Sequence, residues 1–260
     1  MKTKLMLLIV TAFIGSTVRV QSDETLNLGR SWLVQMYDNS AGQMMTKGTE
    51  LVESGNYEKA RQCYDAAIAR DPKEWAPYFS RALVFAHQQK WALAARDFNT
   101  VLQLSPTNYL AAIFRGWVNE RLGNYKSSLA EYDRILSVGP LPLTRALTLN
   151  SRAWLRATCP DANFRNAKQA IADARAACNL TSWGKPDHID TLAAAYAEAG
   201  DFDSAVRFEQ QALAHDRKEE DRKGYEYRLS MYQATSVSVP LAISWTTKKC
   251  RFRTANWSMN

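Results

Sequence analysis

Residues that carry chemistry in enzymes are scarce in this sequence of 260 residues. It has three histidines, which are scattered, and four cysteines, none of them in a Cys-x-x-Cys pair. No glycine-rich phosphate loop and no group of residues with metal-ligand spacing can be found. We therefore expect no metal, no cofactor and no nucleophile–base pair, and we predict that the protein is not an enzyme.

Glycine and proline are also sparse, with 11 and 8 residues, which suits an all-helical protein. The apolar run from Leu5 to Ile14 is too short for a membrane span, which needs ~20 residues. It follows Lys2 and Lys4 and precedes a more polar stretch, so residues 1–22 are predicted to be a signal peptide cut near Ser22. An exported protein, periplasmic or secreted, is then expected. The alternative is an uncleaved helix, either amphipathic or buried.

Cysteines in an exported chain raise the question of disulfide bonds. Cys159 ends one expected helix, and Cys178 lies at the far end of the next, antiparallel helix. The distance from Ala167 to Cys178 along that helix is ~16 Å, at 1.5 Å per residue. A disulfide needs Cα atoms within ~7 Å, so this pair is not expected to bond. Cys63 and Cys178 are instead expected to be small buried residues.

The net charge of +7 is located at the two ends of the chain. The first 19 and the last 21 residues contain no acidic side chain, and their basic residues account for the whole excess: Lys2, Lys4, Arg19, Lys248, Lys249, Arg251 and Arg253. The body between them is neutral overall. A neutral body does not suit a surface that follows a phosphate backbone, so nucleic acid is not an expected partner.

One stretch of the sequence, Gly55 to Pro72, returns at a fixed spacing of 34 residues. Tyr57 is matched by Trp91 and Tyr125, and the other members of the pattern follow in the same way: Ala60, Ala94 and Ser128; Tyr64, Phe98 and Tyr132; Pro72, Pro106 and Pro140. A fixed period of this length is typical of an array of helical hairpins. The small residues and the rings are expected to pack the two helices of each hairpin, and each proline to start the next unit.

The pattern predicts an all-α solenoid of about five helix-turn-helix repeats over 41–233. The repeats are expected at about 41–74, 75–108, 109–142, 143–185 and 186–219, followed by a capping helix at 220–233. The fourth repeat is irregular, with helices near 143–158 and 165–180 and a longer loop at Cys159–Phe164. Residues 23–40 are predicted to be a linker or a short helix, and 234–260 a non-helical or disordered basic tail.

These residues resemble the tetratricopeptide repeat over roughly 41–219. The segment from Arg152 to Phe202 also resembles one that is common in bacterial members, with Thr158-Cys159-Pro160-Asp161 and Asp190-Thr191-Leu192-Ala193 as its clearest parts. The resemblance implies a right-handed superhelix in which the first helix of each repeat lines a concave face. It implies binding of a protein or peptide, not catalysis.

Carried over from the family, the ligand-facing positions of the groove lie on the first helix of each repeat. In the middle of that face they are apolar and aromatic: Phe79, Leu83, His87, Ile113, Trp117, Arg121, Asn150 and Trp154. Exposed rings of this kind could grip an extended segment or an amphipathic helix. The alternative is that Phe79, Trp117 and Trp154 fill gaps between neighbouring first helices.

Arg81, Arg115 and Arg152 occupy one position of successive repeats, and we call them the arginine ladder. The ladder could meet an acidic partner, or it could form a solvated face that pairs with acids of the adjacent helix. The first hypothesis for function is a scaffold that binds a protein segment in its groove. The alternative is a structural subunit of a cell-envelope assembly, which acts through its edges and ends and touches the membrane only through the basic tail.

Overall fold

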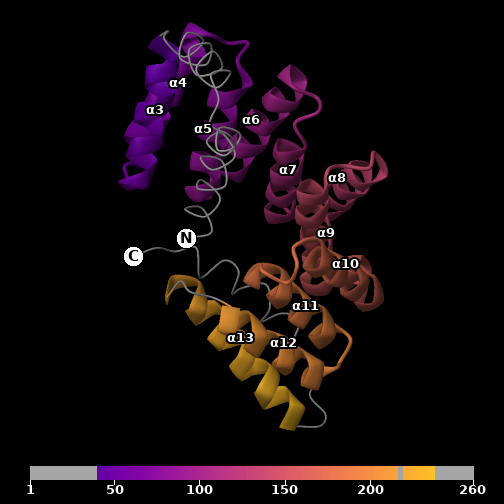
Figure 1. Cartoon of the computed structure of the whole chain (residues 1–260). Coiled ribbons are helices and arrows are strands. Elements are labelled where there is room, and N and C mark those ends of the chain that lie inside the picture. Colours follow the sequence, from indigo (N-terminus) through magenta and orange to yellow (C-terminus); the bar gives the residue numbers. More distant parts are fainter. Residues whose placement is uncertain (1–39, 216–218, 238–260) are drawn as a thin grey trace, which may run out of the picture. The chain divides into compact units, whose positions relative to one another are not determined.

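The computed structural model describes residues 40–215 and 219–237, which form eleven α-helices, one short 3-10 helix and no strand (Figure 1). The expected signal peptide, the 23–40 linker except its last residue, and the basic tail beyond 237 lie outside these described residues. The helices are α3 (Ser40–Glu53), α4 (Tyr57–Arg70), α5 (Trp75–His87), α6 (Trp91–Leu104), α7 (Tyr109–Arg121), α8 (Tyr125–Ser137), α9 (Pro142–Thr158), α10 (Ala167–Leu180), α11 (Pro186–Glu198), α12 (Phe202–His215) and α13 (Glu219–Val237).

Helices that are consecutive in the sequence pack as antiparallel pairs, which confirms the predicted all-α, helix-turn-helix architecture. The helices expected near 143–158 and 165–180 are observed as α9 at 142–158 and α10 at 167–180, and the expected cap at 220–233 is observed as α13. Helix α13 continues to Val237, four residues past the expected end of the cap. Residues 234–237 are therefore helical and do not belong to the predicted non-helical tail. The burial of Tyr232 and the hydrogen bond from Thr235 Oγ1 to the Met231 carbonyl at 2.8 Å stabilise this last turn.

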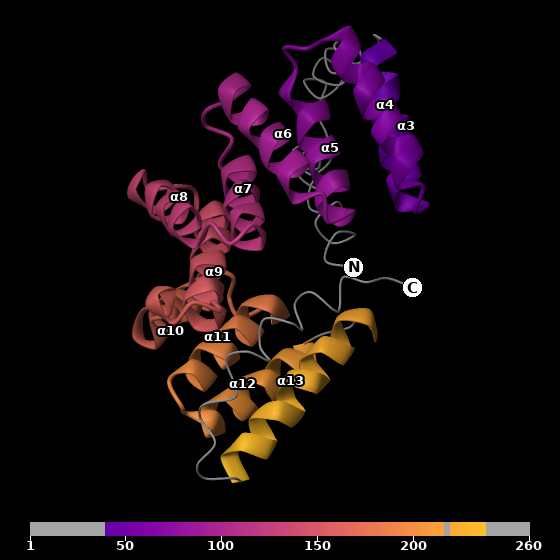
Figure 2. The ribbon, with the colours of Figure 1, turned by 180° about the vertical axis from the view of Figure 1, so that it is seen from behind.

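The chain divides into two compact units, with the boundary between Ala111 and Ala112 in the first turn of α7. The first unit holds α3 to α6. The second holds the rest of α7 and continues through α13, which lies alongside α12 in both views (Figures 1 and 2). No helix of the described residues is long and apolar enough to cross a membrane.

Each of two hairpins is packed by a glycine of one helix against a tyrosine of the next. A Cβ atom on Gly48 would lie 2.5 Å from Tyr64 Cε1, and one on Gly116 would lie 2.6 Å from Tyr132 Cε1. Both tyrosine side chains are fully buried. The rings at the eighth position of these second helices are thus core residues, as the period predicts, and only glycine allows them to approach so closely.

The second hairpin lacks the usual glycine in its turn. Gly55 ends the first helix of the first hairpin with φ +78°, a conformation that costs glycine little. Gln89 takes the equivalent place between α5 and α6 and is held at φ +58°. Its neighbour Lys90 donates its N–H to the Phe85 carbonyl at 2.8 Å, so the turn closes with the same hydrogen bonding despite the side chain.

The long loop of the fourth repeat is ordered by a short 3-10 helix, Ala162–Phe164, and by one arginine. Arg165 Nη1 donates to the Cys159 carbonyl at 3.0 Å, and its Nε lies 2.9 Å from Glu198 Oε1 on α11. Asn166 then caps α10 by accepting from the Gln169 N–H at 2.9 Å. The loop therefore connects the fourth hairpin to the fifth through its side chains as well as its backbone.

Candidate functional site

In the first unit, three predicted groove residues lie on α5, and all three are less than a tenth exposed. Phe79 packs edge-to-face on Phe98 of α6, with ring centroids 5.6 Å apart. His87 stacks on Tyr57 of α4 with centroids 3.8 Å apart, and burial lowers the pKa of the imidazole. These contacts attach both rings to neighbouring helices of their own unit.

The other five predicted groove residues lie in the second unit, on α7 and α9. Ile113, Trp117 and Trp154 are also less than a tenth exposed, and Trp154 packs in a cluster with small residues of α9, α10 and α11: Ala157, Ala170, Ala194 and Ala195. Arg121 and Asn150 are half-buried, and Asn150 Oδ1 has no hydrogen-bond partner.

The rings of the predicted groove therefore do not form an open apolar patch in this structure. For Trp154, filling the space beside α10 and α11 is the observed arrangement. Direct contact with a partner would need these rings to become accessible, whereas Arg121 and Asn150 already present surface to solvent. The ligand-facing role of the eight residues stays a prediction.

The arginine ladder pairs with acids of the second helices. The sequence interpretation in which the ladder pairs with acids of the adjacent helix had this feature. Arg81 holds Asp97 of α6 in a two-point contact, with Nε to Oδ2 at 2.7 Å and Nη2 to Oδ1 at 2.8 Å. Its Nη1 donates to Asp65 Oδ1 of α4 at 2.7 Å. These hydrogen bonds, above all those to Asp97, raise the pKa of the guanidinium.

Arg152 repeats this arrangement in the second unit. Its Nε and Nη2 donate to Asp173 of α10 at 2.7 and 2.8 Å, and Nη1 donates to Asp133 of α8 at 2.6 Å. Arg115 pairs with Glu131 of α8. The Arg81 and Arg152 side chains are only 15% exposed, so the ladder is a partly buried set of cross-links and not the solvated face that was expected.

Sequence reasoning missed the partners of the ladder, although a signal for them exists. In the first three repeats the acids lie 16 residues from an arginine: Asp65 before and Asp97 after Arg81, and Glu131 after Arg115. That spacing connects a residue of one helix to the facing residue of the next.

The fifth repeat breaks the ladder, because Leu192 stands before Ala193 where earlier repeats have arginine. An arginine of α13 replaces it. Arg228 Nε lies 2.5 Å from Asp190 Oδ1 of α11 and 3.3 Å from Glu209 Oε1 of α12. Asp190 is 1% exposed and Glu209 is 0% exposed. We call these three residues the Arg228 cluster.

Glu209 occupies a position that the period assigns to the hydrophobic core. It is the eighth residue of α12, and the eighth residues of α4, α6 and α8 are Tyr64, Phe98 and Tyr132. Its Oε2 is buried and has no hydrogen-bond partner. Burial, and then the carboxylate of Asp190, raise the pKa of Glu209 well above its ordinary 4.5, against the opposing effect of Arg228.

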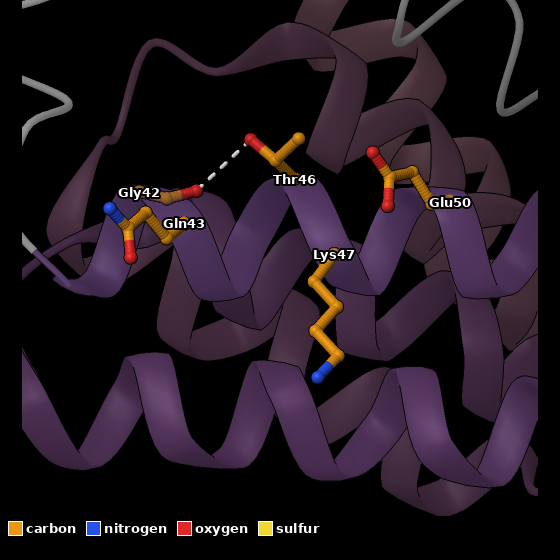
Figure 3. Close-up of a pocket in the computed structure, with 5 residues that line it drawn as sticks. All are labelled: Gly42, Gln43, Thr46, Lys47 and Glu50. Carbon is orange, nitrogen blue, oxygen red and sulfur yellow. Dashed lines mark hydrogen bonds between the residues drawn. The ribbon is translucent and has the colours of Figure 1, made fainter.

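A shallow hollow on α3 does not have the character of a site. It is lined by Gly42, Gln43, Thr46, Lys47 and Glu50, all from one helix. Figure 3 shows their side chains pointing in different directions, with Thr46 hydrogen-bonded to the Gly42 carbonyl at 3.1 Å. The polar groups do not converge on one point, as a ligand site requires.

No group of three or more histidine, cysteine or acidic side chains that could hold a metal occurs in the part of the chain that the structure describes. Cys63, Cys159 and Cys178 are free thiols, so the prediction that Cys159 and Cys178 do not pair is confirmed. Burial raises the pKa of the Cys178 thiol to about 12. This thiol is a packing residue, as expected from the sequence.

The consecutive hairpins define a helical repeat protein. The model of the tetratricopeptide repeat family matches residues 45–109 and 88–142. Among solved structures, the hetero-tetramer Cut9–Hcn1 of the APC/C is similar with a TM-score of 0.65 at 17% identity, covering 90% of this chain and 43% of that one. A thermophilic tetratricopeptide repeat protein of Thermus thermophilus is similar with a TM-score of 0.60 at 17% identity, covering 76% of this chain and all of that one.

Residues 45–142 therefore match the tetratricopeptide repeat, and the fold of the chain is similar to that of solved helical repeat proteins. A curated relative, the tetratricopeptide repeat and J domain-containing co-chaperone DNJ1 of Fusarium oxysporum, is 26% identical over 170 residues. The match covers 65% of this chain and only 32% of the relative's length. Human sperm-associated antigen 1 is 29% identical over 94 residues, which is 36% of this chain and 10% of that protein. Proteins of this class mediate protein–protein interaction.

Proposed function

We propose that the protein is a non-enzymatic scaffold that binds a peptide or a helix of a partner protein along the first helices of its repeats. The proposal rests on a contrast in side-chain size along the first helices of the repeats. The hairpins themselves are closed by small residues such as Gly116 and Ala153, and large rings stand beyond them on the same helices, at Trp117 and Trp154. Trp154 packs on Ala170 of its hairpin partner α10 and on Ala194 and Ala195 of α11, so a bound segment would contact only the part of its ring that stays accessible.

The name of the fungal relative, a co-chaperone, supports a protein as the partner class. In the second unit, Arg121 and Asn150 would provide the polar contacts to the bound segment, because both are partly exposed. Asn150 Oδ1 is a buried acceptor without a partner, and a backbone N–H of a bound segment would satisfy it. The rings would supply the apolar part of the surface.

The polar pair gives the sharper test. Replacing buried rings, as in Phe79→Ala with Trp117→Ala, is expected to cost about 3–5 kcal/mol of folding stability for each ring. Loss of binding would then be hard to separate from unfolding. We expect Arg121→Glu with Asn150→Ala, which removes the acceptor, to weaken binding at least ~10-fold while the melting temperature stays near that of the unaltered chain.

The measurement is made in two stages. Affinity capture of the full chain from its own cell extract and mass spectrometry identify the partner, and calorimetry with the purified partner then gives the affinity of each variant. Lys126→Glu is the matched control, since Lys126 is exposed on α8, the second helix of the same repeat. Equal affinities for the double variant and the control would contradict groove binding.

A second candidate is favoured by one exposed turn. Val138 and Leu141, between α8 and α9, are 53% and 77% exposed, and Leu143 in the first turn of α9 is 44% exposed, so three neighbouring apolar side chains face solvent. Clustered exposed apolar residues commonly mark a protein interface. This turn suits a structural subunit of a cell-envelope assembly that contacts its neighbours through an edge.

The edge hypothesis predicts that Leu141→Gln with Leu143→Gln releases the protein from its assembly and leaves the melting temperature unchanged. Leu180→Gln is the control, because Leu180 is also exposed, at 41%, at the end of another second helix. Sedimentation of native extracts distinguishes the two. Unaltered sedimentation of the double variant would exclude this edge as the contact.

We also propose that the protein is exported after cleavage near Ser22, on the strength of the basic and then apolar N-terminal sequence. N-terminal sequencing of the protein from its source should then start near Asp23. Recovery of a chain that begins at Met1 would contradict export through a cleaved signal.

A further inference from the structure

The contact between α13 and the last hairpin contains one buried acid more than its arginine can neutralise. Arg228 carries a single positive charge, and it faces Asp190 on α11 and Glu209 on α12, both almost inaccessible to water. If both carboxyl groups were ionised, the cluster would hold a net negative charge inside the protein. Burying such a charge is far more costly than burying a neutral carboxyl group.

The ladder arginines show the contrast. Arg81 and Arg152 also face two acids each, but in both cases one acid reaches water: Asp65 is 36% exposed and Asp133 is 51% exposed. Asp65 has a second arginine, Arg61, as a partner, and water can solvate the charge of Asp133. At Arg228 neither acid reaches water, so the surplus negative charge has to be removed by protonation of one carboxyl group.

The position of that proton follows from the geometry. Asp190 Oδ1 is close to Arg228 Nε, at 2.5 Å, and Glu209 Oε1 is more distant, at 3.3 Å. Glu209 Oε2 is the buried oxygen without a hydrogen-bond partner, and it is therefore the atom on which a proton removes most of the cost. Glu209 and not Asp190 is the acid expected to be neutral.

We propose that α13 is a proton-controlled latch, which docks on α11 and α12 while Glu209 is protonated and loosens when Glu209 loses its proton. The latch holds the last hairpin closed at mildly acidic pH. As the pH rises, the cluster acquires its uncompensated charge, and separation of α13 returns both acids and the arginine to water.

The direction of the pH dependence follows from linkage. The pKa of Glu209 is raised in the docked state, so between its ordinary value of 4.5 and the raised value the docked state holds one proton more than the undocked state. Docking should then weaken about tenfold for each pH unit across that window. Above the raised pKa the loss is complete.

The other titratable groups around Glu209 do not produce this dependence. On α13, Tyr232 is buried beside the cluster with its pKa raised well above 10 by burial, and Tyr225 donates to Asp187 Oδ1 of α11 at 2.9 Å. Arg228 keeps its charge, because the attraction of Asp190 and Glu209 outweighs burial and raises its pKa. The raised pKa of Glu209 is therefore the one on which the dependence rests.

His188 on the opposite side of α11 provides an internal reference of opposite sign. Its Nδ1 lies 3.2 Å from Thr181 Oγ1 at the end of α10, and burial lowers the pKa of the imidazole. A lowered histidine pKa means stability that is lost as the pH falls through about 6.5. The packing of α10 on α11 should therefore strengthen, and not weaken, as the pH rises from acid to neutral.

The test is amide hydrogen exchange of the full chain, read by mass spectrometry between about pH 5 and pH 9 and corrected for the intrinsic pH dependence of exchange. We expect the protection of residues 219–237 to fall by up to about tenfold for each pH unit, while the protection of residues 167–180 does not fall. Glu209→Gln, which mimics the neutral acid, should keep α13 docked and remove the dependence. Asp133→Asn, which removes an exposed acid from the ladder, should leave the dependence as it is.

If a variant folds poorly, the protonation of Glu209 can be measured directly in the unaltered protein. The 13C shift of the Glu209 carboxyl group in the unaltered protein should titrate well above pH 4.5. Titration near the ordinary value, protection of α13 that does not change with pH, or a dependence that persists in Glu209→Gln would each overturn the proposal.

Discussion

Arg152 and Arg228 lie in the same unit, and each faces two carboxyl groups from two different helices. They differ in where the second acid lies. Asp133 beside Arg152 is 51% exposed, whereas Asp190 and Glu209 beside Arg228 are both buried. Equal charge counts therefore have unequal consequences: water balances the first cluster, and only a proton can balance the second.

The comparison also separates a repeated contact from a terminal one. Each ladder arginine comes from the first helix of its own repeat, and Arg81 and Arg152 also pair with an acid of the preceding hairpin, Asp65 and Asp133. At the last hairpin the arginine comes from α13, outside the repeat pattern. The chain thus uses a different helix to satisfy acids that no further repeat would reach.

The largest effect is expected from removing the arginine of the buried cluster. Arg228→Met should lower the free energy of unfolding by about 3 kcal/mol, because Asp190 loses its counter-charge at a place where neither it nor Glu209 reaches water. Arg152→Met should cost less, since only Asp173 is left buried there. Urea denaturation followed by circular dichroism measures both. A cost for Arg152→Met that equals or exceeds that of Arg228→Met would remove the distinction between the clusters.

A smaller loss of stability is expected in the third repeat, where Tyr132 occupies the position that Glu209 has in the fifth. Gly116→Ala would place a Cβ atom 2.6 Å from Cε1 of Tyr132, and such overpacking costs about 1–3 kcal/mol. The fifth repeat has alanine at the equivalent Ala193, 16 residues before the smaller Glu209. Thermal denaturation should show the loss, and in Gly116→Ala with Tyr132→Leu the alanine should cost less. If it costs as much with leucine present, the ring is not the cause.

The smallest effect on stability is expected from Asp133, the exposed acid beside Arg152. Asp133→Asn should cost less than ~1 kcal/mol, and less still at high salt, because the pair it breaks is open to water. The exposed pair Arg222–Glu226 on α13, at 2.9 Å, serves as the reference. Melting curves at low and high salt measure both. A salt-independent loss above that limit would show that Asp133 is structurally buried in solution.

The helices could be predicted because the same residue types return every 34 residues at the positions that form and pack a helical hairpin. Tyr57, Tyr125 and Phe202 each begin the second helix of a hairpin, as expected. The C-terminal contact could not be predicted in this way. Arg228 meets Glu209 and Asp190 across 19 and 38 residues, on a helix that has no counterpart in the period.

The candidate groove was predictable only in its positions. Phe79 and Trp154 lie on first helices as expected, but the exposure of a ring depends on every helix that surrounds it. Trp154 is covered in part by Ala194 and Ala195, whose small size gives no signal in the sequence. Gln89, at a turn where glycine is usual, shows similarly that hydrogen bonds of a closed hairpin can impose a backbone conformation that the residue itself disfavours.

The outer face of α13 decides whether copies of the protein can add to one another. Its side chains that face solvent are mainly polar, among them Arg222, Lys223, Glu226 and Gln233. A hairpin end without this cover would present an apolar surface to which another hairpin could add, and repeated head-to-tail addition produces filaments rather than closed oligomers. By covering α12, α13 prevents a second copy from adding a hairpin to this face of α12.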